Sequence, residues 1–208
     1  MRKAIKEKEM TSTQRFLLSF QTCQWWNAVI VQAKRFLDLL HDDHGGDPWS
    51  NENCCMFIAE RMFLITALFH AVENIEKLDC ELQRAGDTSL RSVIQTIEKV
   101  ASLQDIKNLR DMNEHSLDYL MDAGRKQDEF RSTVTKDEYT FHTTAAWTIV
   151  HGDAKTMLLG NVEIDKLLII MKEQLPFVRQ KTKEVYEREL MSSNNDAKDR
   201  NEGENDGC

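Results

Sequence analysis

The organisation of this chain is decided by residues 103–120, LQDIKNLRDMNEHSLDYL. Leucine and isoleucine recur there at spacings of three and four residues or their multiples, and no glycine or proline interrupts before Gly124. That period is typical of an amphipathic α-helix, so we expect one helix over about residues 103–123. Arg110 and Asn113 occupy positions of the apolar stripe where a hydrophobic residue is expected.

The polar side chains of this helix form the candidate site. A half-buried arginine needs a partner, because an unpaired charge in a low dielectric costs several kcal/mol. Asp111 and Tyr119 lie four residues before and four residues after His115, which places them on its face of a helix. The pattern predicts an imidazole between a carboxylate and a phenol, next to the fixed cation of Arg110.

Composition and charge limit the classes of function. The chain has 208 residues, of which 41% are hydrophobic, enough for the core of one domain. A formal net charge of −8 argues against a protein that coats nucleic acid or an anionic membrane non-specifically. No run of about 18 apolar residues and no signal-peptide pattern is found, and the five cysteines lack metal-type spacing. We therefore expect a cytoplasmic protein with reduced thiols, no membrane contact, no cofactor and no metal.

Helical periodicity extends through most of the chain. It predicts long helices at about residues 12–41 and 51–84, a shorter helix at 88–102 and a last helix at about 162–190. Pro176 should kink or divide the last helix. The first two helices are long enough to expose more apolar surface than one small bundle covers, so we expect a homodimer.

Two local features have a structural and a functional interpretation. Trp25 and Trp26 lie on two sides of the first helix, and aromatic residues at helical spacing favour a core or subunit interface over a base-stacking platform. His41 and His44 lie among aspartates in a Gly- and Pro-containing loop. A metal site needs three or four rigidly held ligands, so an ordinary loop is favoured. The predicted buried side of the second helix includes Met56, Met62 and Phe63.

The expected fold class is mainly α: an up-and-down bundle of four or five helices with a small C-terminal β-hairpin followed by a helix. The hairpin should pair residues 139–150 with residues 155–164 through a turn at 151–154. The segments predicted in chain order are a charged leader at 1–11, the helical bundle at 12–123, a charged linker at 124–138, the hairpin and helix at 139–190 and a disordered acidic tail at 191–208.

The pattern Arg110-Asp111-x-x-x-His115 resembles the signature of the HEPN superfamily, in which arginine, a polar residue and then histidine stand with four residues between the arginine and the histidine. Members are all-α bacterial and archaeal proteins of toxin and antiphage systems. The resemblance implies that two copies meet at a dimer interface and build a composite site that cuts RNA without metal. It also implies an antitoxin-type partner protein.

The resemblance assigns a role to each residue of the motif. His115 would be the general base or acid at the ribose 2′-hydroxyl, because imidazole can take up and release a proton near neutral pH. Arg110 would bind the scissile phosphate and stabilise its added charge. Asp111 would orient the imidazole or raise its pKa. The residues that would support these three are Asn113, Glu114 and Tyr119.

Two other interpretations stand beside the endoribonuclease. In a non-catalytic dimeric scaffold, Arg110 pairs with Glu114, Asp111 or a carboxylate such as Glu73, and the motif is buried and mutually satisfied. In a ligand-sensing interaction module, the pocket lies elsewhere, centred on Trp147 and the hairpin. The endoribonuclease instead requires an exposed cleft with positive potential.

Overall fold

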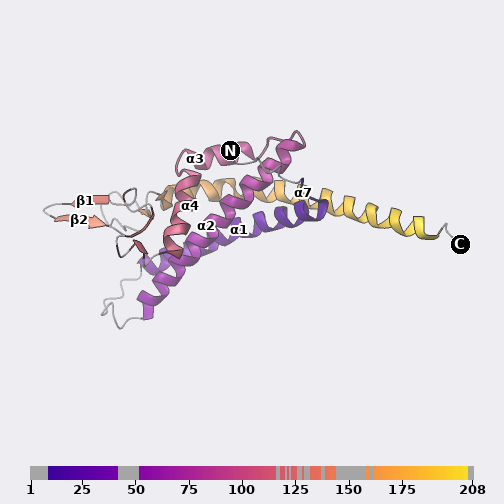
Figure 1. Cartoon of the computed structure of the whole chain (residues 1–208). Coiled ribbons are helices and arrows are strands. Elements are labelled where there is room, and N and C mark those ends of the chain that lie inside the picture. The colour runs from indigo at the N-terminus through magenta and orange to yellow at the C-terminus, as the bar shows by residue number, and fades with distance from the viewer. Residues whose placement is uncertain are drawn as a thin grey trace.

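The chain folds as a mainly α-helical bundle, as the sequence predicts (Figure 1). The structure is a computed structural model and describes residues 9–41, 52–115, 118–119, 121, 123–125, 128, 132–136, 139–143, 158–159 and 162–205. Its helices are α1 (Ser12–His41), α2 (Glu52–Arg84), α3 (Arg91–Glu98), α4 (Leu103–Glu114) and α7 (Ile164–Asn205). The loop with His44 lies outside the described residues.

Three long helices supply most of the core. α1 lies against both α2 and α7, α4 lies on α2, and α3 contacts α2 and α7 (Figure 1). Trp26 of α1 is fully buried, and its indole Nε1 donates a hydrogen bond of 2.9 Å to the carbonyl oxygen of Met171 in α7. Trp25 stacks on His70 of α2 with ring centroids 4.5 Å apart. The tandem tryptophans therefore join three helices, and Trp26 offers no free face for a base.

The start of α1 is fixed by a cap and by a contact with α7. The backbone N–H of Gln14 donates to Thr11 Oγ1 at 3.2 Å, and the Gln14 side chain accepts from the Thr11 N–H at 2.9 Å. This reciprocal pair satisfies two N–H groups that a helix start leaves open. Ser12 then donates to Glu189 Oε2 at 2.9 Å, and Arg15 lies 3.2 Å from the same oxygen. The last helix is thereby tied to the first residue of the bundle.

α7 is longer than predicted. We expected it to end near Leu190 and to be followed by disorder, yet it continues to Asn205. Pro176 lies inside this one helix and does not divide it. No proline follows Pro176, and a helix already nucleated by packing adds residues at little cost even where the sequence has no apolar stripe.

The strand pairing also differs from our prediction. β1 (Ser132–Lys136) pairs antiparallel with β2 (Tyr139–Thr143), and β3 (Leu158–Leu159) pairs with β4 (Val162–Glu163). The expected pairing of residues 139–150 with 155–164 is therefore wrong, and β1 lies in the segment that we assigned to a linker. Residues 132–136 read STVTK, a run with high β propensity, but the charged residues on either side led us to assign the segment to a linker. A short connection favours pairing with the nearest strand.

The turn after α2 is held by a glycine and an ion pair. Gly86 has φ +81°, a conformation that suits glycine beyond a helix end, and the N–H of Asp87 donates to Leu82 O at 2.9 Å. Lys181 of α7 lies 2.6 Å from the carboxylate of Asp87. Hydrogen bonds from Lys181 and Ser89 lower the pKa of Asp87 to about 2, and the same contact raises the pKa of Lys181.

We expect Asp87→Asn to lower the free energy of unfolding by about 1 kcal/mol at pH 7, since the pair is partly exposed and screened. A lowered carboxylate pKa adds stability above the unfolded value of about 3.9, and this contribution is lost as the pH falls toward about 2. Urea unfolding at several pH values measures it: the gap between wild type and variant should close below about pH 4. Asp38→Asn, at an exposed position of α1, is the control and should leave stability unchanged.

Candidate functional site

The helix that carries the candidate site is shorter than predicted. α4 begins at a cap in which Ser102 Oγ accepts from the N–H of Asp105 at 3.0 Å, and it ends at Glu114 with His115 as its C-cap. The expected helix to residue 123 is therefore wrong. Tyr119 is buried, and a Cβ added to Gly124 would lie only 2.5 Å from its ring. To bury this ring against Gly124 the chain must leave the helix before residue 119, although the helical spacing of apolar residues continues to Leu120.

Arg110 is held at the surface by one carboxylate and one aromatic ring. Its guanidinium lies 2.6 Å from Glu114 one turn along α4, and its central carbon lies 4.9 Å from the ring centroid of Phe69 in α2. The Arg110 side chain is still 42% exposed. An exposed pair of this kind contributes at most about 1 kcal/mol, so the guanidinium can exchange Glu114 for another anion.

His115 lies between two carboxylates at the end of α4. Its Nε2 is 4.0 Å from Asp111 and its Nδ1 is 3.7 Å from Asp118, while the side chain is 58% exposed. Each ring nitrogen thus faces an acid, and the imidazole is open to solvent. Asp111 lies beside His115, as the spacing of four residues predicts. Tyr119 lies in the core instead of on the face of His115, because the helix has ended before it.

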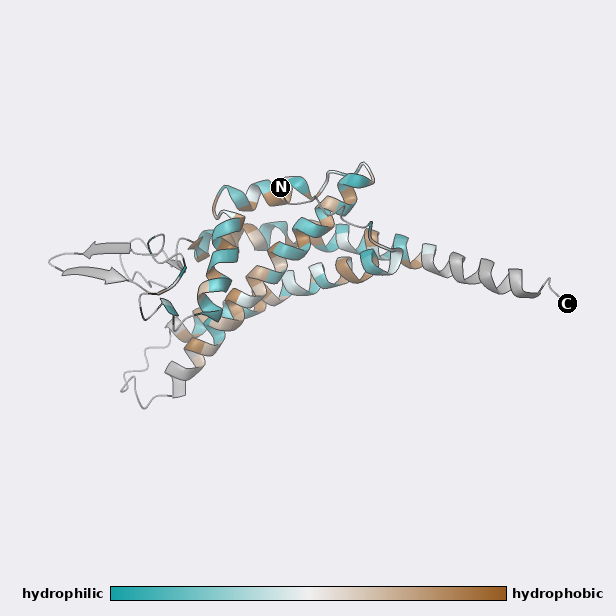
Figure 2. Ribbon diagram, viewed as in Figure 1, coloured by the Kyte–Doolittle hydropathy of each residue, from teal (hydrophilic) through white to brown (hydrophobic). Residues whose placement is uncertain are grey.

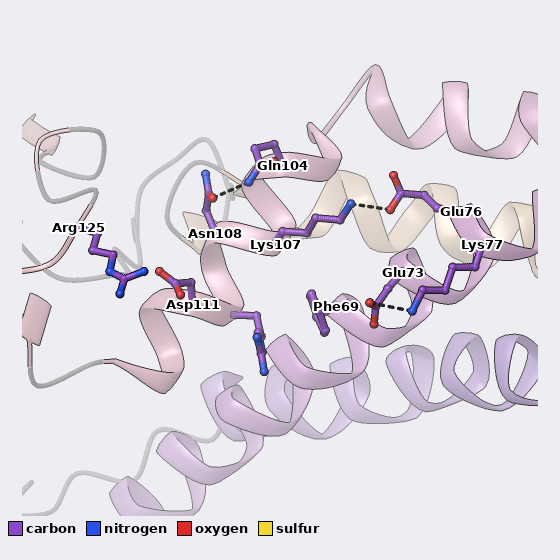
Figure 3. Close-up of a pocket in the computed structure, with 10 residues that line it drawn as sticks. Phe69, Glu73, Glu76, Lys77, Gln104, Lys107, Asn108, Asp111 and Arg125 are labelled. Carbon is purple, nitrogen blue, oxygen red and sulfur yellow. Dashed lines mark hydrogen bonds and ion pairs between the residues drawn. The ribbon is translucent and has the colours of Figure 1, made fainter. Parts of the chain in front are cut away.

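An open groove runs between α2 and α4 next to these residues (Figure 3). Its volume is about 670 Å³. Two ion pairs cross or follow it: Lys107 lies 2.7 Å from Glu76, and Lys77 lies 2.9 Å from Glu73. The residues that line it are Phe69, Glu73, Glu76, Lys77, Gln104, Lys107, Asn108, Arg110, Asp111 and Arg125.

Arg125 also lines the groove. It is exposed, and in Figure 3 it points toward Asp111 from the opposite side. The lining therefore contains four basic side chains and three acidic ones. Because the basic side chains lie so close to carboxylates, a polyanion can bind in the groove only if its phosphates replace those carboxylates as the partners of the basic groups.

The groove continues into an apolar surface on the same helix. Phe69 is half-buried under Arg110, whereas Met62, seven residues earlier and on the same side of α2, is exposed. α4 runs antiparallel to α2, since Lys107 contacts Glu76 and Arg110 contacts Phe69. Because α4 ends at Glu114, it does not reach the first part of α2.

We call this surface the apolar end of α2, and define it by Met56, Ile58, Met62 and Phe63. All four side chains are exposed, Phe63 by 61%. Figure 2 shows the brown, hydrophobic ribbon continuing along α1 and α2 beyond the end of α4. Three of these residues were predicted to be buried, which is wrong within one chain.

The structure thus brings part of the predicted site together. Arg110 and Asp111 line the groove, His115 borders it through Asp111, and Glu114 pairs with Arg110. Asn113 is half-buried on α4. Arg110 and His115 of one chain make no contact with each other. Phe69 and Lys107 were missed as site residues, because an aromatic residue at helical spacing and a lysine on a charged face carry no specific signal.

The described residues contain no group of three or more His, Cys, Asp or Glu side chains that could hold a metal ion. Within the same part of the chain, no helix has both the length and the apolarity that crossing a membrane requires. Comparison of the sequence and fold with protein-family models, curated proteins and solved structures gives no match. The case for a function therefore rests on the α2–α4 groove and its neighbours.

Proposed function

We propose that this protein is a metal-independent endoribonuclease of the HEPN type that acts as a homodimer. The observation that carries the proposal is the exposure of the motif. His115 and Arg110 lie open to solvent beside the α2–α4 groove. A motif that served only to join helices would be buried and fully paired.

The chemistry needs a base, an acid and a cation around one phosphate. His115 of one protomer takes the proton of the ribose 2′-hydroxyl, and O2′ attacks phosphorus. The bond from phosphorus to O5′ breaks, and the partner's His115 donates a proton to the leaving oxygen. The products are a 2′,3′-cyclic phosphate and a 5′-hydroxyl end. Arg110 exchanges Glu114 for the phosphate, where a guanidinium fork makes two charge-assisted hydrogen bonds.

A second copy of the chain supplies what one chain lacks. One chain contributes a single His115, whose two ring nitrogens face Asp111 and Asp118, so it supplies no second imidazole to act as the acid. The apolar end of α2 lies next to the groove on the outward face of the same helix. Burying its four side chains in a two-fold interface would remove the same apolar groups of both protomers from water. It would also bring Arg110 and His115 of the two protomers together.

One observation favours the non-catalytic scaffold as a second candidate. Lys77 and Lys107 each pair with a carboxylate of the groove, and Arg110 pairs with Glu114 of its own helix. A surface whose charges are already paired suits a protein that joins partners without chemistry. The pocket expected for the ligand-sensing module, around Trp147, lies outside the described residues.

The test is cleavage of a labelled RNA oligonucleotide by the purified protein in EDTA. We expect wild type to leave 2′,3′-cyclic phosphate ends, and His115→Ala and Arg110→Ala to lower the rate by at least about 100-fold. Glu114→Gln should keep or raise the activity, because it frees Arg110.

Two matched variants control for a general loss of charge or imidazole. Arg84 is exposed by 42%, as Arg110 is, and also pairs with a carboxylate of its own helix, and His70 is a half-exposed histidine of α2. Arg84→Ala and His70→Ala should cleave like wild type. An inert wild type, with His115→Ala and Arg110→Ala defective only in dimerisation, would leave the scaffold as the function.

A further inference from the structure

A second, separate hollow lies between α1 and α7, two helices that run side by side (Figure 1). Its volume is about 230 Å³. The residues that line it are Ser19, Phe20, Cys23, Arg179, Thr182, Lys183 and Tyr186. None of them belongs to the α2–α4 groove, so this hollow, which we call the α1–α7 slot, is independent of the proposed nuclease site.

The hydroxyl groups of Ser19 and Thr182, in the floor of the slot, already donate their hydrogen bonds to backbone carbonyl oxygens. Ser19 and Thr182 are buried, and each donates within its own helix, Ser19 to Phe16 O and Thr182 to Val178 O, both at 2.8 Å. With these donors satisfied, the floor presents mainly carbon. An apolar group would lose nothing in hydrogen bonding by lying on it.

Aromatic rings form one wall. Tyr186 stacks on Phe16 with ring centroids 4.3 Å apart, which fixes its ring. Phe20 stands further away, 6.2 Å from Tyr186 and tilted by 40°, and it is exposed. The slot therefore has one fixed ring and one open ring, the arrangement in which a flat or narrow apolar ligand gains contact area.

Two cations stand at the rim. Arg179 and Lys183 are four residues apart on α7 and both are exposed. Arg179 Nε donates to Asn27 Oδ1 at 3.1 Å, a neutral partner, and no carboxylate among the described residues pairs with Arg179. Lys183 lies 3.6 Å from Glu187, but its side chain is 74% exposed, so that pair is weak. A protein of net charge −8 thus keeps a local positive edge above an apolar floor.

We propose that the α1–α7 slot binds a small amphiphilic carboxylate, with an aromatic ring or short acyl chain in the slot and its carboxylate on Arg179 and Lys183. The volume limits the ligand to a small one, since typical ligand pockets are about 300–1,000 Å³. The apolar body lies on the floor of the slot, against the exposed ring of Phe20. The charge complementarity of the rim selects an anion over a neutral molecule of the same shape.

Cys23 lies in the slot and reports its occupancy. It is half-buried, whereas Cys80 on α2 is exposed and does not line the slot, so Cys80 serves as the internal control. The probes are indole-3-carboxylate and its neutral analogue, indole-3-carboxamide. We measure alkylation of each cysteine in the full-length protein by iodoacetamide, followed peptide by peptide with mass spectrometry after tryptic digestion.

Indole-3-carboxylate should slow alkylation of Cys23 at least about fivefold at saturation and leave Cys80 unchanged. The variant Arg179→Gln/Lys183→Gln should weaken the carboxylate at least about tenfold and leave binding of the carboxamide as it is in wild type. Lys34→Gln/Lys172→Gln removes the same charge at two exposed positions outside the slot and should bind the carboxylate like wild type.

Three results would overturn the proposal. The first is no protection of Cys23 by either probe up to about 5 mM. The second is equal protection by both probes in wild type and in the rim variant, which would mean an apolar hollow without anion selectivity. The third is protection of Cys23 that rises with protein concentration in the absence of any probe, which would mean that a second copy covers the slot.

Discussion

Trp26→Ala should lower the free energy of unfolding by about 3–5 kcal/mol, because it removes the largest fully buried side chain among the described residues and leaves a cavity. The indole touches α1 and α7 and also satisfies the carbonyl oxygen of Met171. Denaturant unfolding followed by circular dichroism measures the change. Trp26→Phe keeps much of the apolar volume but loses the hydrogen bond, so its cost should be intermediate.

Trp25→Ala is the matched control, since it deletes the same side chain at the adjacent position. Trp25 is half-buried and stacks on His70 at the surface, so its loss should cost about 1–2 kcal/mol. Equal effects of the two substitutions would contradict the orientation of α1 in the bundle. Loss of RNA binding by Trp25→Ala alone, without loss of stability, would revive the base-stacking interpretation.

The long helices could be predicted because their signals are strong and local. The bounds of α1 match the prediction, and α2 begins one residue later than expected and ends as predicted. Each helix has a cap or a glycine at one end and an apolar stripe many turns long. These local signals predict a helix even when the elements that it packs against are unknown. The mainly α class follows from these helices together with α7.

The shorter elements could not be predicted for a physical reason. The period of residues 103–120 continues past Glu114, but the burial of Tyr119 against Gly124 is a tertiary contact that no local pattern contains. The same holds for β1, whose partner is chosen by proximity to β2 and not by its own sequence. Where long-range packing competes with local propensity, the packing decides.

The candidate site contains features that local sequence patterns predict and features that depend on long-range packing. The spacing of Asp111 and His115 on one helical turn was predictable, and so was the need of Arg110 for a partner, which is Glu114. The contact of Arg110 with Phe69 required knowledge of how α4 lies on α2. The exposure of Met62 and Phe63 depends on where α4 stops. An apolar stripe in a sequence states that a surface needs cover, but not whether the cover comes from the same chain.

If a second copy supplies that cover, Phe63→Glu should raise the dissociation constant of the homodimer at least about 1,000-fold. Phe63 is the most exposed residue of the apolar end of α2. In a two-fold interface each substitution occurs twice, so two phenyl rings are lost and two carboxylates must be desolvated or leave the contact. Sedimentation velocity over a range of concentrations measures the change, and the monomer should keep the helical content of wild type.

Ile169→Glu adds the same charge at an equally open apolar residue, since Ile169 is 57% exposed on α7. This variant should remain a dimer and cleave RNA like wild type. Phe63→Glu should lose cleavage in proportion to the loss of dimer, and raising its concentration should restore both together, because His115 itself is intact. A monomeric Phe63→Glu with full activity would show that one chain holds the complete site. A dimer unaffected by Phe63→Glu would place the interface on another face, and the open end of α2 would then need a different partner to cover it.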